Sequence, residues 1–261
     1  MSNSAIQLSI FDLPTTPAPT KSPSRNNIIP FPIQHKPTHT QQRVSPIRDP
    51  QVVDQIVHAL QNTGRHGLRN AAIFVLQLAI GRRTNDILSM KLKDIYDFST
   101  RTVKSVITVD EHKTGKTARD LPIPTQSRQF LLKYIHTLKN KSVSALLFPS
   151  QKRNPDGSQR PLSTASLDNI YQDITTAIYS TLDTPETHIS SYAARKTYGY
   201  NIYMECMKNN NGQLPGTDIN ALQYVQSCFN HRDTMTTLRY IGAYDAPAQK
   251  LAEDIQSQYS F

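Results

Sequence analysis

Side chains that could act on a phosphate ester recur in three segments of this 261-residue chain. Arg83 and Arg195 lie in the first two segments, and His231 and Tyr240 lie nine positions apart in the third. Arginine donates two parallel hydrogen bonds from a planar group that stays protonated, so two arginines can clamp one phosphate. A tyrosine hydroxyl could then attack the phosphorus atom. These residue types are suited to phosphoryl transfer, in which fixed positive charge can stabilise the transition state.

A lysine pair lies between the first two segments, in the sequence His112-Lys113-Thr114-Gly115-Lys116. This stretch is expected to form the turn between two strands. An ammonium group is compact, and its pKa shifts when it loses water, so a lysine on such a turn could protonate a leaving hydroxyl as a general acid. Lys113 and Lys116 are both candidates, and an exposed turn that only touches phosphates is the alternative.

The three segments match the sequence patterns of one family. Residues 81–87 match Gly-x-Arg-x-x-Glu/Asp-Leu, residues 194–199 resemble Leu-Arg-His/Lys-Thr-Phe-Gly, and residues 237–241 match Thr-x-Arg-Tyr-Ile. In this order, with a lysine-bearing hairpin between the first two, they resemble the active site of the tyrosine recombinases, the phage-integrase family of DNA strand-exchange enzymes. The resemblance covers residues 48–245.

The resemblance implies how a DNA phosphate would be held. Arg83 and Arg195 would be the two arginines that clamp it, and a ring nitrogen of His231 would donate a hydrogen bond to the same phosphate. Arg82 is the nearest alternative to Arg83, although it falls on a position that is usually apolar in the family. Asp86 lies one helical turn beyond Arg83 and would orient the local structure.

The resemblance also implies a covalent intermediate. Tyr240 would attack the phosphate to form a 3′-phosphotyrosyl link that conserves bond energy, so the strands could rejoin without ATP. Lys113 stands where the family carries its general acid and is preferred to Lys116. The family usually has His or another basic residue where this chain has Tyr192. A phenol can donate a hydrogen bond to phosphate but is no base near neutral pH, so Tyr192 and His188, one helical turn upstream, are further candidates for the site.

The elements that position these residues follow from the spacing of apolar side chains. Helical spacing predicts a helix over 52–60. A strongly apolar run predicts a core helix over 68–80, which Gly81 ends, and a short helix is expected over 84–90. Strands are expected over 103–109 and 118–123. Further helices are expected near 126–138, 164–180, 190–207, 218–228, 233–240 and 246–257. The fold class is α+β, mainly α: a helical bundle with a small antiparallel β-sheet, which resembles the tyrosine-recombinase catalytic fold.

The chain is expected to divide into three parts. Residues 1–47 are rich in Pro, Ser and Thr, and because proline fixes φ and lacks a backbone donor, they are predicted to form a flexible tail. Residues 48–245 form the expected catalytic domain, without the helical DNA-clamping domain that usually precedes it in the family. Residues 246–261 are expected to form a helix with an apolar stripe, which family members commonly exchange between protomers; packing on its own domain is the alternative.

A short apolar stretch stands out within the tail. Gln7, Leu8, Ile10 and Phe11 resemble the peptide by which bacterial proteins dock on the replication sliding clamp, in which a Gln leads and a Leu-Phe-like pair fills a pocket. A locally sticky segment that packs on its own domain or on a neighbour is the alternative. A sliding-clamp contact is therefore one hypothesis for this stretch.

The composition favours a polyanionic partner, since 29 Lys and Arg against 20 Asp and Glu give a net charge of +9. Cys206 and Cys228 make neither a zinc site nor a disulfide framework, so free thiols are expected. A Gly-rich phosphate loop and an acidic cluster are both absent from the sequence, so no cofactor or metal is expected. Without an apolar run that could span a bilayer or a signal pattern, a cytoplasmic protein is expected.

These features together predict a site-specific recombinase that acts on double-stranded DNA as a homo-tetramer. The reaction could be integration, excision, inversion or plasmid resolution, and an enzyme of a bacterial mobile element is the default. Two alternatives stay open: a DNA-binding protein of the same fold without turnover, and relaxation of supercoils in the manner of a type IB topoisomerase. The first predicts specific binding without a covalent adduct, and the second predicts cleavage with little sequence preference.

Overall fold

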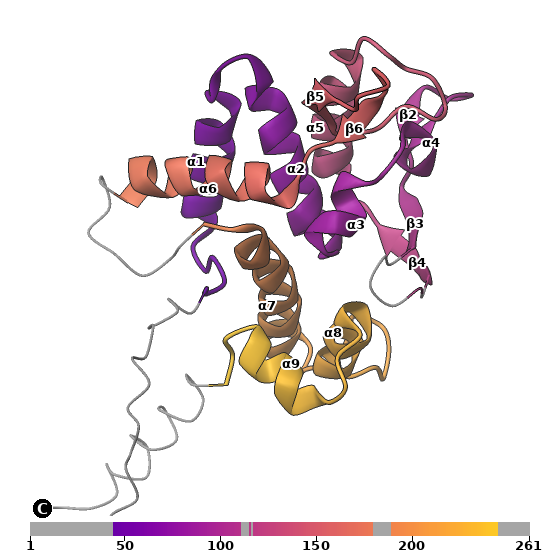
Figure 1. Cartoon of the computed structure of the whole chain (residues 1–261). Coiled ribbons are helices and arrows are strands. Elements are labelled where there is room, and N and C mark those ends of the chain that lie inside the picture. The colour runs from indigo at the N-terminus through magenta and orange to yellow at the C-terminus, as the bar shows by residue number, and fades with distance from the viewer. Residues whose placement is uncertain (1–43, 111–114, 116, 180–188, 245–261) are drawn as a thin grey trace, which may run out of the picture. The chain divides into compact units, whose positions relative to one another are not determined.

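Helices make up most of the computed structural model, which describes residues 44–110, 115, 117–179 and 189–244 (Figure 1). The helices are α1 (Pro50–Gln61), the 3₁₀ helix η1 (Gly64–His66), α2 (Gly67–Ile80), α3 (Thr84–Leu88), α4 (Leu92–Ile95), α5 (Thr125–His136), α6 (Thr164–Tyr179), α7 (Ser191–Asn209), α8 (Ala221–Phe229) and α9 (Thr234–Tyr240). The strands are β1 (Tyr96–Asp97), β2 (Thr102–Val103), β3 (Val106–Asp110), β4 (Thr117–Pro122), β5 (Pro149–Arg153) and β6 (Gln159–Pro161). All of these elements belong to one compact unit, residues 42–261.

Helix α2 is the centre of the main core. Nearly all of its side chains are apolar or small, and Ala71, Ala72, Phe74 and Leu76 are fully buried. Helices α1, α5 and α7 all pack against it. A helix that is apolar on every side suits such a central place, and the helix predicted over 68–80 is confirmed.

A buried polar chain ties α6 and α3 to this central helix. The Tyr171 hydroxyl of α6 donates to Gln77 Oε1 at 2.6 Å, and Gln77 Nε2 donates to Thr84 Oγ1 at 3.3 Å. Both Tyr171 and Gln77 are fully buried, where unpaired polar atoms would be costly. The network therefore fixes the start of α3, which follows directly after Arg83.

Small antiparallel sheets border the helices. Strands β3 and β4 pair from Val106 with Pro122 to Asp110 with Thr117, which confirms the predicted hairpin. The sequence predicted one sheet, but the described residues form three two-stranded sheets. The strand expected over 103–109 is divided, because residues 102–103 pair with β1 after a turn in which Asp97 Oδ1 accepts from Ser99 N at 2.8 Å.

The C-terminal helices form a second, smaller apolar cluster. Val225, Phe229, Ile241 and Ala243 are its buried members. Helix α8 packs against α7 and α9, and α7 leads from the main core to both (Figure 1). The segment that carries His231 and Tyr240 is thus attached to the rest of the molecule largely through α7.

The helices predicted over 52–60 and 84–90 are confirmed as α1 and α3, and the five predicted between 126 and 240 are confirmed as α5 to α9, with small differences at their ends. The helix expected over 246–257, the stretch at residues 7–11, His188, Lys113 and Lys116 lie outside the described residues. In the described part of the chain, no helix is long and apolar enough to cross a membrane. Cys206 and Cys228 are free cysteines, as the sequence predicted.

Candidate active site

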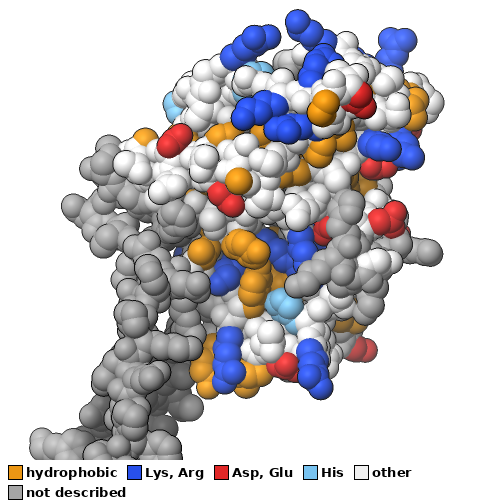
Figure 2. All heavy atoms as spheres, in the orientation of Figure 1, with side chains coloured by type: hydrophobic (Ala, Val, Ile, Leu, Met, Phe, Trp, Pro, Cys, Tyr) orange, Lys and Arg blue, Asp and Glu red, His pale blue; other side chains and the backbone are white. Residues whose placement is uncertain are grey.

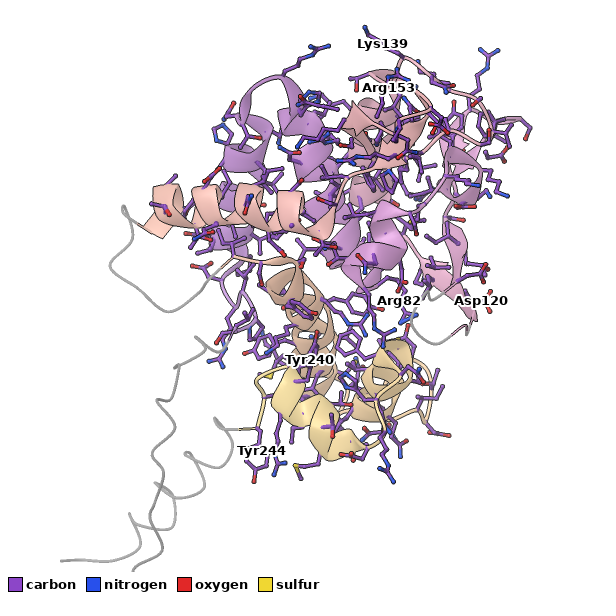
Figure 3. All side chains as sticks on the ribbon, in the orientation of Figure 1. Arg82, Asp120, Lys139, Arg153, Tyr240 and Tyr244 are labelled. Carbon is purple, nitrogen blue, oxygen red and sulfur yellow. The ribbon has the colours of Figure 1, made fainter. Side chains whose placement is uncertain are left out.

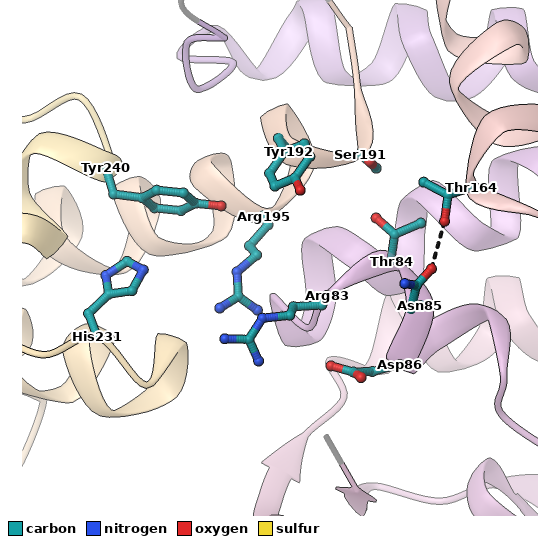
Figure 4. Close-up of a pocket in the computed structure, with 10 residues that line it drawn as sticks. All are labelled: Arg83, Thr84, Asn85, Asp86, Thr164, Ser191, Tyr192, Arg195, His231 and Tyr240. Carbon is teal, nitrogen blue, oxygen red and sulfur yellow. Dashed lines mark hydrogen bonds between the residues drawn. The ribbon is translucent and has the colours of Figure 1, made fainter. Parts of the chain in front are cut away.

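Five of the catalytic and possible catalytic residues predicted from the sequence meet at a pocket of about 310 Å³ (Figure 4). They are Arg83, Tyr192, Arg195, His231 and Tyr240. The other lining residues are Thr84, Asn85, Asp86, Thr164 and Ser191. The pocket is therefore built by segments that are far apart in the sequence, around the start of α3, the start of α7 and the α8–α9 region.

Arg195 is fixed between the ends of two helices. Ser190 caps α7 by accepting from Ala193 N at 3.2 Å, which places Arg195 in the second turn of the helix. Arg195 is only 5% exposed; its Nη1 donates to Gly81 O at 2.7 Å and its Nη2 donates to Phe229 O at 3.1 Å. A buried charge needs such partners, so Arg195 both joins α2 to α8 and supplies positive charge to the pocket.

The turn at Gly81 brings Arg83 to the pocket. Gly81 ends α2 with φ of 59°, and a Cβ added there would lie 2.2 Å from Cδ1 of Tyr198. Glycine is therefore required both by the left-handed backbone and by the close ring. The half-buried Arg83 then becomes the residue that precedes α3.

Arg82 occupies a different environment from Arg83. Its side chain is 2% exposed and is not part of the pocket lining, and it lies beside α8 (Figure 3). Burial raises the pKa of Tyr224 in α8, and the charge of Arg82 partly opposes this shift. Of the two neighbouring arginines, Arg83 is the one that contributes to the described pocket, while the burial of Arg82 agrees with its usually apolar position.

A left-handed residue places His231 at the pocket. Asn230 ends α8 with φ of 54°, and His231 follows with Nδ1 3.1 Å from Oγ1 of Thr237. Burial, followed by the positive charges of Arg195 and Arg83, lowers the pKa of His231. The imidazole therefore favours its neutral form more than an exposed histidine does.

Tyr240 is the last residue of α9, which Asp233 caps by accepting from Thr236 N at 2.7 Å. The Tyr240 ring centre lies 4.9 Å from that of His231, and the hydroxyl points into the pocket (Figure 4). Burial raises the pKa of Tyr240, whereas the charge and hydrogen bonding of Arg195 and the charge of Arg83 oppose this shift. The two arginines thus favour the phenolate that a nucleophile needs.

Tyr192 lines the pocket from the first turn of α7 and is 62% exposed. Its hydroxyl lies on the same side of the pocket as that of Tyr240 in Figure 4. Among the described lining residues, His231 is the single histidine. The position at which the family usually has a basic residue therefore presents a phenol to the pocket.

The sequence analysis did not single out Thr164 and Asn85. Thr164 Oγ1 donates to Asn85 Oδ1 at 2.6 Å across the pocket wall (Figure 4). Thr164 begins a predicted helix, where backbone N–H groups are open to a ligand, and this position was the one available signal. The described residues contain no group of three or more His, Cys, Asp or Glu that could hold a metal ion.

The sequence matches the phage integrase family over residues 48–246, and the chain belongs to this family. The match includes all the described pocket residues. No curated protein is significantly similar to the chain in sequence.

Solved structures share the fold at low sequence identity. XerA recombinase is 16% identical with a TM-score of 0.53, over 83% of this chain and 67% of that chain. XerH recombinase bound to a palindromic difH substrate is 16% identical with a TM-score of 0.53, over 82% and 53%. The Tn1549 transposon integrase in complex with circular intermediate DNA is 17% identical with a TM-score of 0.50, over 77% and 62%. The chain therefore spans less than two thirds of the integrase and about half of XerH.

Proposed function

We propose that the chain is a site-specific DNA recombinase that breaks and rejoins double-stranded DNA through a 3′-phosphotyrosyl intermediate. The observation that carries the proposal is the convergence of Arg83, Arg195, His231 and Tyr240 at one pocket. Membership of the phage integrase family supports it. The Tn1549 integrase and XerH, which share the fold, were solved with DNA, and this supports DNA as the substrate.

In this mechanism Tyr240 gives its phenolic proton to the neutral imidazole of His231, attacks the phosphorus atom and displaces the 5′ oxygen of the next nucleotide. Arg83 and Arg195 bind the non-bridging oxygens, on which negative charge increases in the transition state. Lys113 gives a proton to the leaving 5′ oxygen, with Lys116 as the alternative donor. The hydroxyl of Tyr192 donates a hydrogen bond to the phosphate.

His231 is proposed to stabilise the same phosphate. Once the imidazole has taken the proton of Tyr240, the bound phosphate opposes the effect of the two arginines on His231 and stabilises the protonated ring, which can donate a hydrogen bond. The reverse attack by the 5′ hydroxyl of another strand restores the phosphodiester and frees Tyr240. The reaction therefore needs no external energy source.

The surface supports contact with DNA beyond the pocket. Figure 2 shows Lys and Arg side chains above, inside and below a hollow on one face of the molecule. Lys139 and Arg153 lie at the end of the molecule remote from Tyr240 (Figure 3). Because each phosphate contact releases counterions, affinity is expected to fall steeply as the salt concentration rises.

The assembly is part of the same proposal. We expect a homo-tetramer on DNA in which residues 246–261 form a helix that can be exchanged between protomers. Gln7, Leu8, Ile10 and Phe11 would contact a sliding clamp. The default setting is the cytoplasm of a bacterium that carries a mobile element, with integration, excision, inversion or plasmid resolution as the outcome.

The test is a covalent-adduct assay on supercoiled DNA from the native locus, in EDTA. Wild type is expected to give a denaturation-resistant protein–DNA adduct, and Tyr240→Phe is expected to give none. Tyr244→Phe is the matched control, because Tyr244 is a partly exposed tyrosine four residues beyond Tyr240 and outside the pocket lining. An adduct that survives in Tyr240→Phe would refute the assigned nucleophile.

Tyr192 favours one second candidate, a DNA-binding protein of the same fold without turnover. Its phenol stands where the family usually has a basic residue, and the described pocket contains one imidazole. This candidate predicts specific binding with no adduct, even on nicked substrates that trap cleavage. Relaxation of supercoils without sequence preference would instead indicate the activity of a type IB topoisomerase.

A further inference from the structure

Residues 44–48, here called the N-terminal strap, lie against α7. Ile47 N donates to Thr197 Oγ1 at 2.7 Å, and both residues are buried. Lys196 Nζ donates to Val44 O at 2.6 Å. The end of the predicted tail is therefore packed on the helix that carries Arg195.

The strap also contacts the turn that follows the nucleophile helix. Arg48 Nη2 donates to Gly242 O at 3.1 Å, and Gly242 lies two residues beyond Tyr240. A Cβ added at Gly242 would lie 3.1 Å from Cδ of Pro46, which is buried. The backbone at Gly242 and the strap are thus in close contact.

Lys196 joins the strap directly to the nucleophile. Its Nζ lies 5.0 Å from the centre of the Tyr240 ring while it donates to the strap carbonyl of Val44. A cation at this distance from an aromatic ring is attracted to the ring. The Lys196 ammonium group therefore contacts both the strap and the ring of Tyr240.

The strap bridges the two apolar clusters of the molecule. Ile47 belongs to the main core, whereas Ile241, directly after Tyr240, belongs to the small cluster around α8. Helix α9 packs mainly on α8, so its position relative to Arg83 in the main body depends on few connections. The strap supplies a connection between the end of α9 and the main body that does not pass through α8.

We propose that the N-terminal strap and Lys196 position Tyr240 for attack, so that the N-terminal part of the chain is coupled to DNA cleavage. The inference rests on the proposed role of Tyr240 as the nucleophile. The strap and Lys196 act through Tyr240 and do not touch the phosphate. A partner that binds the residues before 44 and displaces the strap would then alter the rate of DNA cleavage.

The first test compares Gly242→Ala with Gly216→Ala. Both glycines have similar left-handed backbones, with φ of 70° and 71°, but Gly216 has no atom within 4 Å of an added Cβ. Gly242→Ala is expected to slow adduct formation on nicked DNA by about 10- to 100-fold, with DNA affinity changed by less than about twofold, because misplaced reacting groups lose rate more than binding. Equal rates for the two variants would overturn the proposal.

The second test examines Lys196 without relying on activity. Lys196→Met removes the charge but keeps the length, and it is expected to speed hydrogen exchange in residues 234–243 while exchange in α2 stays as in wild type. Lys196→Arg, which keeps a cation that can donate to Val44 O, is expected to restore both slow exchange and the adduct rate. Unchanged exchange in Lys196→Met would overturn the positioning role.

These two readouts separate the strap from the proposed function. If wild type forms no adduct, the recombinase proposal fails, while the exchange measurement still decides whether the strap holds α9. If wild type forms the adduct, and Gly242→Ala and Lys196→Met match it in both adduct rate and hydrogen exchange, the strap inference fails and the recombinase proposal stands.

Discussion

Replacing Arg195 with Lys is expected to damage stability and chemistry together. The guanidinium donates from two nitrogens to Gly81 O at 2.7 Å and to Phe229 O at 3.1 Å. An ammonium group keeps the charge but is a single point, so it cannot satisfy both carbonyls from one position. Loss of one charge-assisted hydrogen bond to a buried carbonyl costs about 2 kcal/mol.

This loss of stability can be measured as a decrease in the melting temperature, Tm. For a folded unit of this size, residues 42–261, about 2 kcal/mol corresponds to a decrease in Tm of about 4–8 °C. Adduct formation should fall by about 100-fold or more, because the phosphate loses a bidentate donor. Differential scanning calorimetry and the adduct assay on nicked DNA measure the two effects.

Arg83→Lys is the matched control. Arg83 lines the same pocket but is half-buried and precedes a short helix, so its replacement should change Tm by less than about 2 °C while it also slows adduct formation. The reasoning is refuted if Arg195→Lys has the same Tm as wild type, or if Arg195→Lys and Arg83→Lys show the same decrease in Tm. Either result would mean that the two carbonyl contacts of Arg195 do not join the helices.

Two further perturbations test the pocket. Because burial and the charges of Arg195 and Arg83 lower the pKa of His231, the unfolded chain takes up a proton first as the pH falls, and stability declines below the unfolded pKa of about 6.5. Thermal melts of His231→Gln should therefore lose less Tm than wild type between about pH 7.5 and 5.5. Gly81→Ala should lower the free energy of unfolding in urea by about 1–3 kcal/mol, because its Cβ would meet the ring of Tyr198.

The His231→Gln and Gly81→Ala predictions each have a control. His66, whose pKa is also lowered, chiefly by burial, is present in both proteins of the first pair, so its contribution cancels. Parallel pH curves for wild type and His231→Gln would contradict the lowered pKa. Gly64→Ala shares a left-handed backbone with φ of 72° but has open space around an added Cβ, and it should cost less than Gly81→Ala. Equal losses of unfolding free energy in the two variants would show that the ring of Tyr198 moves away from the added Cβ.

Local sequence was sufficient to predict most helices and five of the ten residues that line the pocket. A nearly continuous apolar run defines α2, and Gly81 ends it because its φ of 59° is strained for other residues. The short motif around Arg195 begins a helix that Ser190 caps. Each of these signals lies within a few residues of the feature that it predicts.

Other features depend on pairings that no local pattern reveals. Strands β5 and β6 are short and largely polar, so they lack an alternating apolar pattern, although residues 154–157, Asn-Pro-Asp-Gly, form a turn signal between them. The strap contacts join Ile47 to Thr197 and Arg48 to Gly242, which are distant in the sequence. These contacts form only when α7 and the turn after α9 are folded against residues 44–48.

The chemistry of Tyr240 depends on a balance that no single segment contains. Burial raises the pKa of its hydroxyl, while Arg195 and Arg83 from two other segments oppose this rise. The same arginines help burial to keep His231 neutral before the attack, and a neutral imidazole can accept a proton. If the chain is a recombinase, this pair of arginines would compensate for Tyr192 by favouring both a phenolate at Tyr240 and an acceptor at His231. That compensation requires the fold to bring the two arginines to one pocket, so the motifs alone could not show it.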